Sequence, residues 1–173
     1  MRTCALTSMP GRFAVLAVLA LAGTTAQAQA SSDSSGGTDP IAKLTGFKET
    51  PSIITTGSAT LELSVGSSSI SYVLTFANLE APATEAHIHI GQPGVAGGVA
   101  AFLCGGGGKS ACPPGGGTVT GTITAADVIG PTAQGIQPGQ LDRLIIAIRA
   151  GVAYTNVHST LHPEGEIRGQ IEY

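Results

Sequence analysis

The amino-acid sequence predicts a mainly β protein, an antiparallel β-sandwich or barrel of about eight strands with one short amphipathic helix. From Ile41 onward, apolar and polar residues alternate in short runs that Gly, Pro and Ser separate, as in strands with one face on a core. One segment, residues 138–151, instead spaces its apolar residues three and four positions apart, as a helix does. The length of 173 residues leaves room for one such domain.

The alternation is clearest in two consecutive runs. Every second residue of 58–65 is apolar, and residues 70–76 place Ile, Tyr, Leu and Phe at alternate positions. Gly66 and the serines after it separate the two runs, which favours a hairpin. We expect strands over residues 41–47, 58–64, 69–77, 84–90, 99–104, 118–123, 152–159 and 165–172.

The helical segment has recognisable ends. Pro138 precedes its first apolar residue, and Gly151 follows its last turn. Its apolar positions form one stripe, so we expect about three turns that lie over one end of the sheet. A shorter helical turn is expected at residues 125–129, with Thr124 as its N-cap.

The first thirty residues have the pattern of an export signal. Arg2 and Arg12 make a basic region before an apolar run at residues 13–22, and AQAQA at residues 26–30 offers two cleavage sites. Residues 31–40 are small and polar, so we expect a disordered lead-in before a domain at residues 41–173. The apolar run is half of the ~20 residues that span a bilayer, which predicts no transmembrane segment in the mature chain. The predicted location is the periplasm or the medium.

Composition narrows the range of partners. The formal net charge is −3, and it becomes more acidic when the signal is removed with its two arginines. Such a chain lacks the basic patch that nucleic acid or an anionic membrane requires. With no Trp and 4% aromatic residues, it also lacks a stacking platform for bases or sugars. We therefore expect an extracytoplasmic protein or an envelope component as partner.

Two cysteines remain after Cys4 leaves with the signal. Cys104 and Cys112 form an even pair in an oxidising compartment, where a disulfide is the usual outcome. The alternative is a metal or redox pair, but the spacing differs from C-x-x-C and the intervening loop is rich in glycine. We expect a disulfide that closes a short surface loop.

Several motifs with catalytic associations lack the context that catalysis requires. GGGGKS at residues 105–110 has no glycine at the first P-loop position and no strand-to-helix setting. Glu164 and Glu166 share a face of the last strand, but Glu166 and Arg168 also share it, which favours an exposed ion-pair ladder. No nucleophile with a base and an orienting acid is found, so we expect a protein that is not an enzyme.

All four histidines lie in two distinctive strings, AHIHIG and NVHSTLH. His87 and His89 alternate with apolar residues, so both project from one face with Cα atoms ~6.5–7 Å apart. His158 ends another expected strand, and His162 follows in a turn. Neutral imidazoles that converge would bind Zn²⁺ or copper. The alternative is that these histidines hydrogen-bond backbone carbonyls and have a structural role.

The chain resembles the CHRD (chordin) domain family in four strings that span about residues 41–172: LTGFKETPSIITTGSATLEL, AHIHIGQPGVAGGVAAFL, LDRLIIAIRAGVAYTNVHS and PEGEIRGQI. The resemblance implies an exported, Ig-like β-sandwich or barrel module. In animals the domain is repeated in chordin, an extracellular antagonist that binds secreted growth factors, and in bacteria it stands alone. Positions that match the family pattern, besides His87, His89 and His158, include Glu49, Gly91, Tyr154, Asn156, Glu166, Arg168 and Gln170.

Two departures from the family pattern matter. Gly98 stands where the family often has Pro, and the family does not require a histidine at position 162. His87, His89 and His158 are therefore the better metal candidates. The H-x-H strand is also similar, more distantly, to that of copper-zinc superoxide dismutase, but the second metal-binding loop of that enzyme has no counterpart here. We expect a non-enzymatic binding or structural module, and the alternative is a histidine-based copper or zinc protein.

Overall fold

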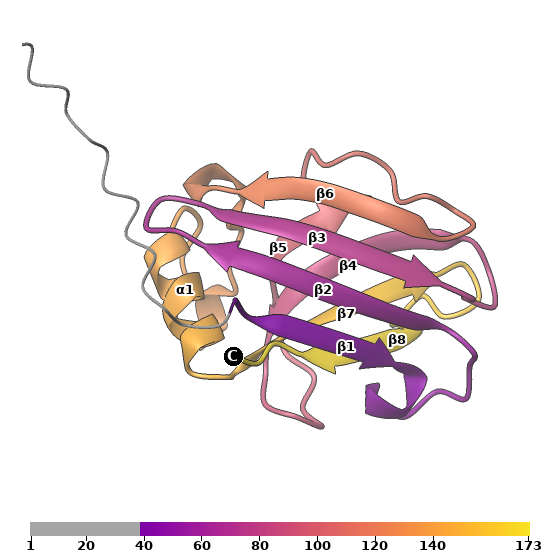
Figure 1. The fold of residues 1–173 in the computed structure, drawn as a ribbon. Helices are drawn as coiled ribbons and strands as arrows, with labels where there is room; N and C mark the ends of the chain where they lie inside the picture. The colour runs from indigo at the N-terminus through magenta and orange to yellow at the C-terminus, as the bar shows by residue number, and fades with distance from the viewer. Residues whose placement is uncertain (1–38) are drawn as a thin grey trace, which may run out of the picture. The chain divides into compact units, whose positions relative to one another are not determined.

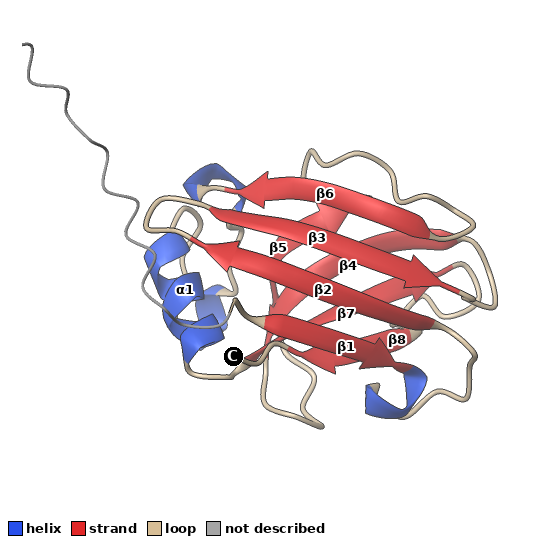
Figure 2. Cartoon of the chain, in the orientation of Figure 1, coloured by secondary structure: helices blue, strands red, loops and turns tan. Residues whose placement is uncertain are grey.

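The computed structural model describes residues 39–173, so the signal and most of the lead-in expected before Asp39 lie outside the described residues. Within the described part, eight strands form one antiparallel sheet (Figures 1 and 2). The strands are β1 (Ile41–Thr45), β2 (Ser58–Val65), β3 (Ile70–Ala77), β4 (Ala83–Ile90), β5 (Val99–Cys104), β6 (Gly117–Ile123), β7 (Ala153–Ser159) and β8 (Ile167–Gln170).

The sheet folds over on itself into a nearly closed barrel or sandwich. Its strand order is β5-β4-β7-β8-β1-β2-β3-β6, and the first and last strands of that order approach each other. In Figure 1, β1, β2, β3 and β6 form one layer in front of β4, β5, β7 and β8. The hydroxyl of Tyr72 on β3 donates a hydrogen bond of 2.7 Å to the carbonyl of Leu103 on β5, which links the two layers. The predicted fold class is confirmed.

The apolar positions of the strands fill the space between the layers. On β3, buried and exposed residues alternate without interruption, and the predicted hairpin pairs Val65 with Ile70 at its tip. Burial of this apolar area drives folding at about 25 cal/mol per Å². The largest side chains that are fully buried are Phe76, Leu44, Leu61, Leu63, Ile70, Leu74, Ile88, Leu103, Ile123, Leu144, Ile148 and Ile167.

The predicted helix is present as α1 (Leu141–Arg149) and covers one end of the layers (Figure 1). Its apolar stripe is buried, and Ile146 on the opposite side is exposed. The helix is shorter than residues 138–151 because Gly139 and Gly151 have φ values of +87° and +68°, outside the helical region. None of the helices in residues 39–173 is both long and apolar enough to cross a membrane.

The ends of several elements differ from the prediction. β1 stops at Thr45 because Gly46–Lys48 forms a 3-10 turn, whose Gly46 carbonyl accepts hydrogen bonds from the amides of Glu49 and Ile53. Pro40 was expected in a disordered segment, but it is buried and its carbonyl accepts a hydrogen bond from the amide of Leu63. Further short 3-10 turns lie at Ala125–Asp127 and Thr132–Gln134.

The glycine-rich loop after β5 is closed by a disulfide between Cys104 and Cys112, whose Cα atoms are 5.0 Å apart. The ammonium group of Lys109 lies 2.7 Å from a carboxylate oxygen of Asp127 and donates to the carbonyl of Thr122. The same carboxylate accepts hydrogen bonds from the amide and hydroxyl of Thr124, at the start of the predicted turn. Lys109 therefore anchors the loop. The loop connects β5 to β6, so GGGGKS does not have the strand-to-helix setting of a P-loop.

Candidate metal centre

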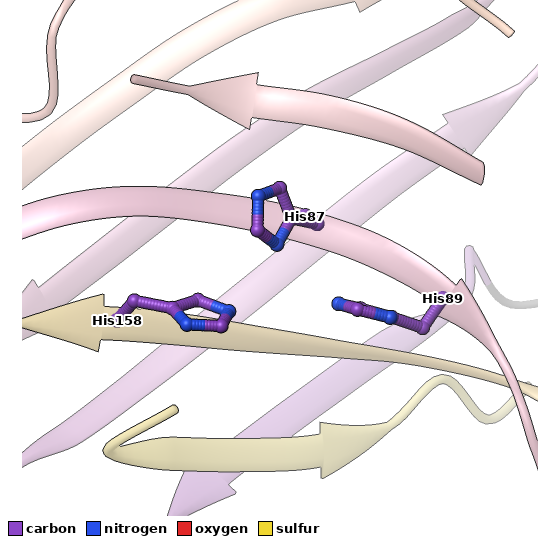
Figure 3. A group of neighbouring side chains, drawn as sticks. All are labelled: His87, His89 and His158. Carbon is purple, nitrogen blue, oxygen red and sulfur yellow. The ribbon is translucent and has the colours of Figure 1, made fainter. Parts of the chain in front are cut away.

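Three histidines meet on the face of β4 and β7 that points away from the apolar core (Figure 3). His87 and His89 alternate on β4, and His158 lies on β7. Each offers one ring nitrogen, and these three atoms lie within 4.8 Å of one another. Figure 3 shows the rings turned toward a common space. The strand alternation brings two of them to one face, and the antiparallel pairing of β4 with β7 brings the third.

This face is buried although it lies outside the apolar core. All seven residues of β7 are buried, and His87, His89 and His158 are 4–8% exposed. Side chains and carbonyls of the segments before and after the strands cover the histidines, including Gly97 and Pro163. One face of β7 therefore packs against apolar side chains of the core. The other face packs against a layer of polar groups, which includes the three histidines.

Each imidazole has one nitrogen in contact with an acceptor, by a hydrogen bond for His89 and His158 and by a charge contact for His87. Nδ1 of His89 lies 2.9 Å from the carbonyl of Gly97, and Nδ1 of His158 lies 2.8 Å from the carbonyl of Pro163. A carbonyl only accepts, so both Nδ1 atoms carry the proton. Nε2 of His87 lies 3.3 Å from a carboxylate oxygen of Glu85, which likewise accepts. The tautomers of His89 and His158 are thereby fixed, and the carboxylate of Glu85 favours the proton on Nε2 of His87.

The other nitrogen of each ring is an unpaired acceptor. Nδ1 of His87, Nε2 of His89 and Nε2 of His158 are buried and have no hydrogen-bond partner among the described residues. Each carries a lone pair when the ring is neutral. The arrangement is that of metal-binding histidines, whose second nitrogen donates to a carbonyl or carboxylate while the first one binds the ion.

Burial keeps two of these rings neutral. It lowers the pKa of His89 to about 4, and the neighbouring His87 and His158 also lower it, while the bond to Gly97 acts in the opposite direction. Burial is also the main cause that lowers the pKa of His87, followed by the charge of His158. Both rings therefore keep their lone pairs at neutral pH, as a metal ligand requires.

Aromatic side chains hold the rings in place. The ring of Phe102 lies edge-on to His87 with centroids 4.5 Å apart, and Tyr154 stacks on His89 with centroids 4.8 Å apart and planes 7° from parallel. The guanidinium carbon of Arg168 lies 3.4 Å from the Tyr154 ring centroid, and the same guanidinium donates to the carbonyls of Gln92 and Val95. These contacts tie the segment between β4 and β5 to the site.

His162 does not join the cluster. His162 lies in the turn between β7 and β8, and its Nε2 is 3.2 Å from a carboxylate oxygen of Glu80. This position agrees with the family pattern, which does not require a histidine at residue 162. Glu85 and Phe102, by contrast, contact the site and were not singled out from the sequence. Glu85 could have been found, since it is two residues from His87 on the same strand and so shares its face.

The expected ion-pair ladder on β8 is wrong. Glu166 and Arg168 are both buried, and no salt bridge in residues 39–173 joins them. One oxygen of Glu166 accepts hydrogen bonds from the hydroxyl of Thr55 and the amide of Glu80. Arg168 turns to backbone carbonyls instead. β8 is an inner strand whose polar face is covered, so Arg168 and one oxygen of Glu166 bond to the covering segments, while the other oxygen of Glu166 has no partner among the described residues.

The family model of the CHRD domain matches residues 41–171. The chain belongs to the CHRD domain family. No curated protein and no solved structure matches it.

The positions that match the CHRD family pattern lie around the histidines. Those on the inner strands lie in the polar layer around the histidines, and Glu49 and Gly91 lie in the segments that cover it. A Cβ on Gly91 would lie 2.7 Å from the carbonyl oxygen of Val95 and 2.9 Å from the ring of Tyr154, so only glycine fits against that ring. The polar CHRD positions of β7 and β8 are Tyr154, Asn156, Arg168 and Gln170.

Proposed function

We propose that this CHRD domain is an exported protein that binds one divalent transition-metal ion through His87, His89 and His158. The observation that carries the proposal is the set of three buried ring nitrogens that lie together without a hydrogen-bond donor from residues 39–173. The amino-terminal pattern of basic residues, an apolar run and small residues supports export to the periplasm or the medium.

The energetics favour an ion between the rings. Each buried acceptor without a partner costs about 1–3 kcal/mol. Three acceptors in one place also repel one another, because their lone pairs point into the same space. A cation bonds to all three at once and converts this cost into binding free energy. The opposite nitrogens already restrain the rings, through hydrogen bonds to the carbonyls of Gly97 and Pro163 and a charge contact with Glu85.

The donor set points to zinc or copper. Imidazole nitrogen suits both ions, whereas magnesium and calcium prefer oxygen. The two described cysteines are joined in a disulfide, so thiolate ligation is not available to this centre. Three protein ligands leave a fourth position for a small molecule, as in zinc sites of the open type. In a direct competition, Cu²⁺ is expected to bind more tightly than Zn²⁺.

The binding or structural module that CHRD membership implies is the second candidate. Exposed apolar side chains on the segments around the polar layer favour it, because Phe47, Ile54 and Leu161 are each more than half exposed. Leu161 precedes Pro163, whose carbonyl holds His158, so an ion at the histidines would also fix the segment that carries Leu161. The expected partner is an extracytoplasmic protein or an envelope component.

The metal proposal is tested by titration of purified protein stripped of metal with a chelator. Calorimetry with Zn²⁺ and with Cu²⁺ should give one site, and the ion should raise the melting temperature. His87→Ala and His158→Ala should abolish the site. His162→Ala is the matched control, since this histidine pairs with Glu80 outside the cluster and its loss should leave binding unchanged. Binding no tighter than that of a short histidine peptide would overturn the proposal.

The module proposal has its own test. Phe47→Ser and Leu161→Ser should weaken retention of the protein on isolated cell envelopes or on a captured partner. The same measurement with His87→Ala and His158→Ala shows whether retention depends on the metal ion. Equal retention of the wild type and the serine variants would count against this surface.

A further inference from the structure

Asn156 is a buried amide beside the three histidines. It lies on β7 directly opposite His87 on β4, and it is two residues from His158, so all three side chains share one face. The side chain is 4% exposed, and its Oδ1 has no hydrogen-bond partner among the described residues. An unpaired amide oxygen thus lies on the same face as the three ring nitrogens.

The two ends of the amide face different groups. A Cβ placed on Gly165 would lie 2.6 Å from Oε1 of Glu49 and 2.8 Å from Nδ2 of Asn156, so the NH₂ end is on the side of Glu49. Burial raises the pKa of Glu49, and Asn156 is among the groups that lower it again, which is the effect of an N–H donor. The Oδ1 end has no partner among the described residues and belongs to a side chain on the face of β4 and β7 that carries the three histidines.

We propose that Oδ1 of Asn156 accepts a hydrogen bond from a water molecule that occupies the fourth position of the metal ion. This inference rests on the proposed function. Three histidine ligands leave that position open. The water supplies the donor that Oδ1 lacks, and Glu49 lies beside the NH₂ end of the amide.

A water molecule, and not the amide itself, bonds to the ion for a chemical reason. Neutral carbonyl oxygens suit magnesium, calcium and manganese, whereas zinc and copper are held by imidazole. An amide oxygen beside a site built from three imidazoles is better used as a hydrogen-bond acceptor. In that role it orients the water without adding charge. Asn156 is therefore a positioning residue of the centre.

The test compares the wild type with Asn156→Leu, which has nearly the same shape and no acceptor. Zn²⁺ affinity should fall about 10- to 100-fold, the usual effect of losing a group that supports a metal site from outside its ligands. Asn156→Asp keeps the oxygen and should retain Zn²⁺ binding. Gln170→Leu is the matched control, because this amide lies on the same polar face but donates to the backbone carbonyls of Gly91 and Gly151.

A second measurement separates positioning from a general loss of structure. In the Co²⁺-loaded protein, azide should replace the water and change the visible spectrum. Replacement in the wild type forfeits the hydrogen bond to Asn156, because azide has no proton to donate. In Asn156→Leu the water has no such hydrogen bond to lose. Azide should therefore bind about 3- to 10-fold more tightly than to the wild type, the equivalent of one hydrogen bond of about 1 kcal/mol.

The outcomes are distinguishable. Weaker Zn²⁺ binding together with tighter azide binding supports the role of Asn156. If the wild type binds Zn²⁺ and Asn156→Leu changes neither affinity, the inference fails and the proposed function stands. A Co²⁺ protein whose spectrum does not respond to azide also overturns the inference. If Asn156→Leu does not fold, loss of Zn²⁺ binding in a folded Asn156→Asp variant overturns it as well. A wild type without affinity for either ion removes the proposed function and the inference together.

Discussion

The imidazole of His89 lies flat against the phenol ring of Tyr154, with the planes 7° from parallel and the centroids 4.8 Å apart. The tyrosine connects the histidine to two other parts of the site. Its hydroxyl accepts a hydrogen bond of 3.1 Å from the amide of Gly97, the residue whose carbonyl holds His89, and its ring lies 3.4 Å from the guanidinium carbon of Arg168. Contacts thus run from His89 on β4 through Tyr154 on β7 to Arg168 on β8, two strands away in the sheet.

Tyr154→Phe should weaken metal binding and cost about 0.5–1.5 kcal/mol of stability, the usual contribution of one hydrogen bond. The ring still stacks, but the Gly97 segment loses its contact with the hydroxyl. Tyr72→Phe is the control, because it removes another buried tyrosine hydroxyl, which bonds to the carbonyl of Leu103 and to none of the residues around His89. Both variants should lower stability in urea denaturation, and only Tyr154→Phe should lower Zn²⁺ affinity. Equal affinities would show that the stack does not orient His89.

The stability of the metal-free protein should fall as the pH is lowered from about 6.5 toward 4. Below the ordinary pKa of about 6.5, the unfolded chain binds protons on His87 and His89. The folded protein keeps these rings neutral, since burial lowers the pKa of His87 and lowers that of His89 to about 4. The unfolded state therefore binds more protons in this range, and stability rises with pH. Urea denaturation across this range should show the slope, and His89→Gln should reduce it.

Metal affinity should persist to a lower pH than ordinary imidazoles allow. Unperturbed histidines would lose an ion as the pH drops through about 6.5. The lowered pKa values of His87 and His89 move that loss downward. Calorimetric titration with Zn²⁺ at a series of pH values between 7 and 4.5 checks this. A loss of affinity centred on 6.5 would mean that the three rings are not buried in solution.

Removal of residues 165–173 should abolish folding. β8 lies between β7 and β1 in the sheet, and Ile167 on it is fully buried. Its loss would leave the backbone of both neighbours unpaired and open the core. Deletion of Tyr173 alone is the control, because this residue is exposed. A truncated chain that melts cooperatively would contradict the position of β8 as an inner strand.

Replacing Cys104 and Cys112 with Ser should cost no more than about 3 kcal/mol, because the loop that the disulfide closes is short. The double variant should keep its metal affinity, since the histidines are on β4 and β7. Alkylation without reduction, followed by mass spectrometry, should find Cys104 and Cys112 of the wild type blocked. Two alkylated thiols would contradict the disulfide.

The sequence by itself determined the β class, the strand positions, the helix and the shared face of His87 and His89. These are local properties, since alternation with period two follows from strand geometry and needs no knowledge of distant neighbours. The convergence of His158 with that pair was inferred from the family resemblance. In the structure, the pairing of β4 with β7 accounts for it.

Tertiary structure alone decided the environment of the polar face. The sequence favours an exposed ladder for Glu166 and Arg168, because alternating charged residues on a strand usually face water. In the fold, β7 and β8 are inner strands and the segments before β2 and after β4 cover their second face, so these groups are buried and bonded to backbone and hydroxyl groups. The same cover buries the imidazoles and fixes the tautomers of His89 and His158. Such contacts join residues more than seventy positions apart, and no local pattern encodes them.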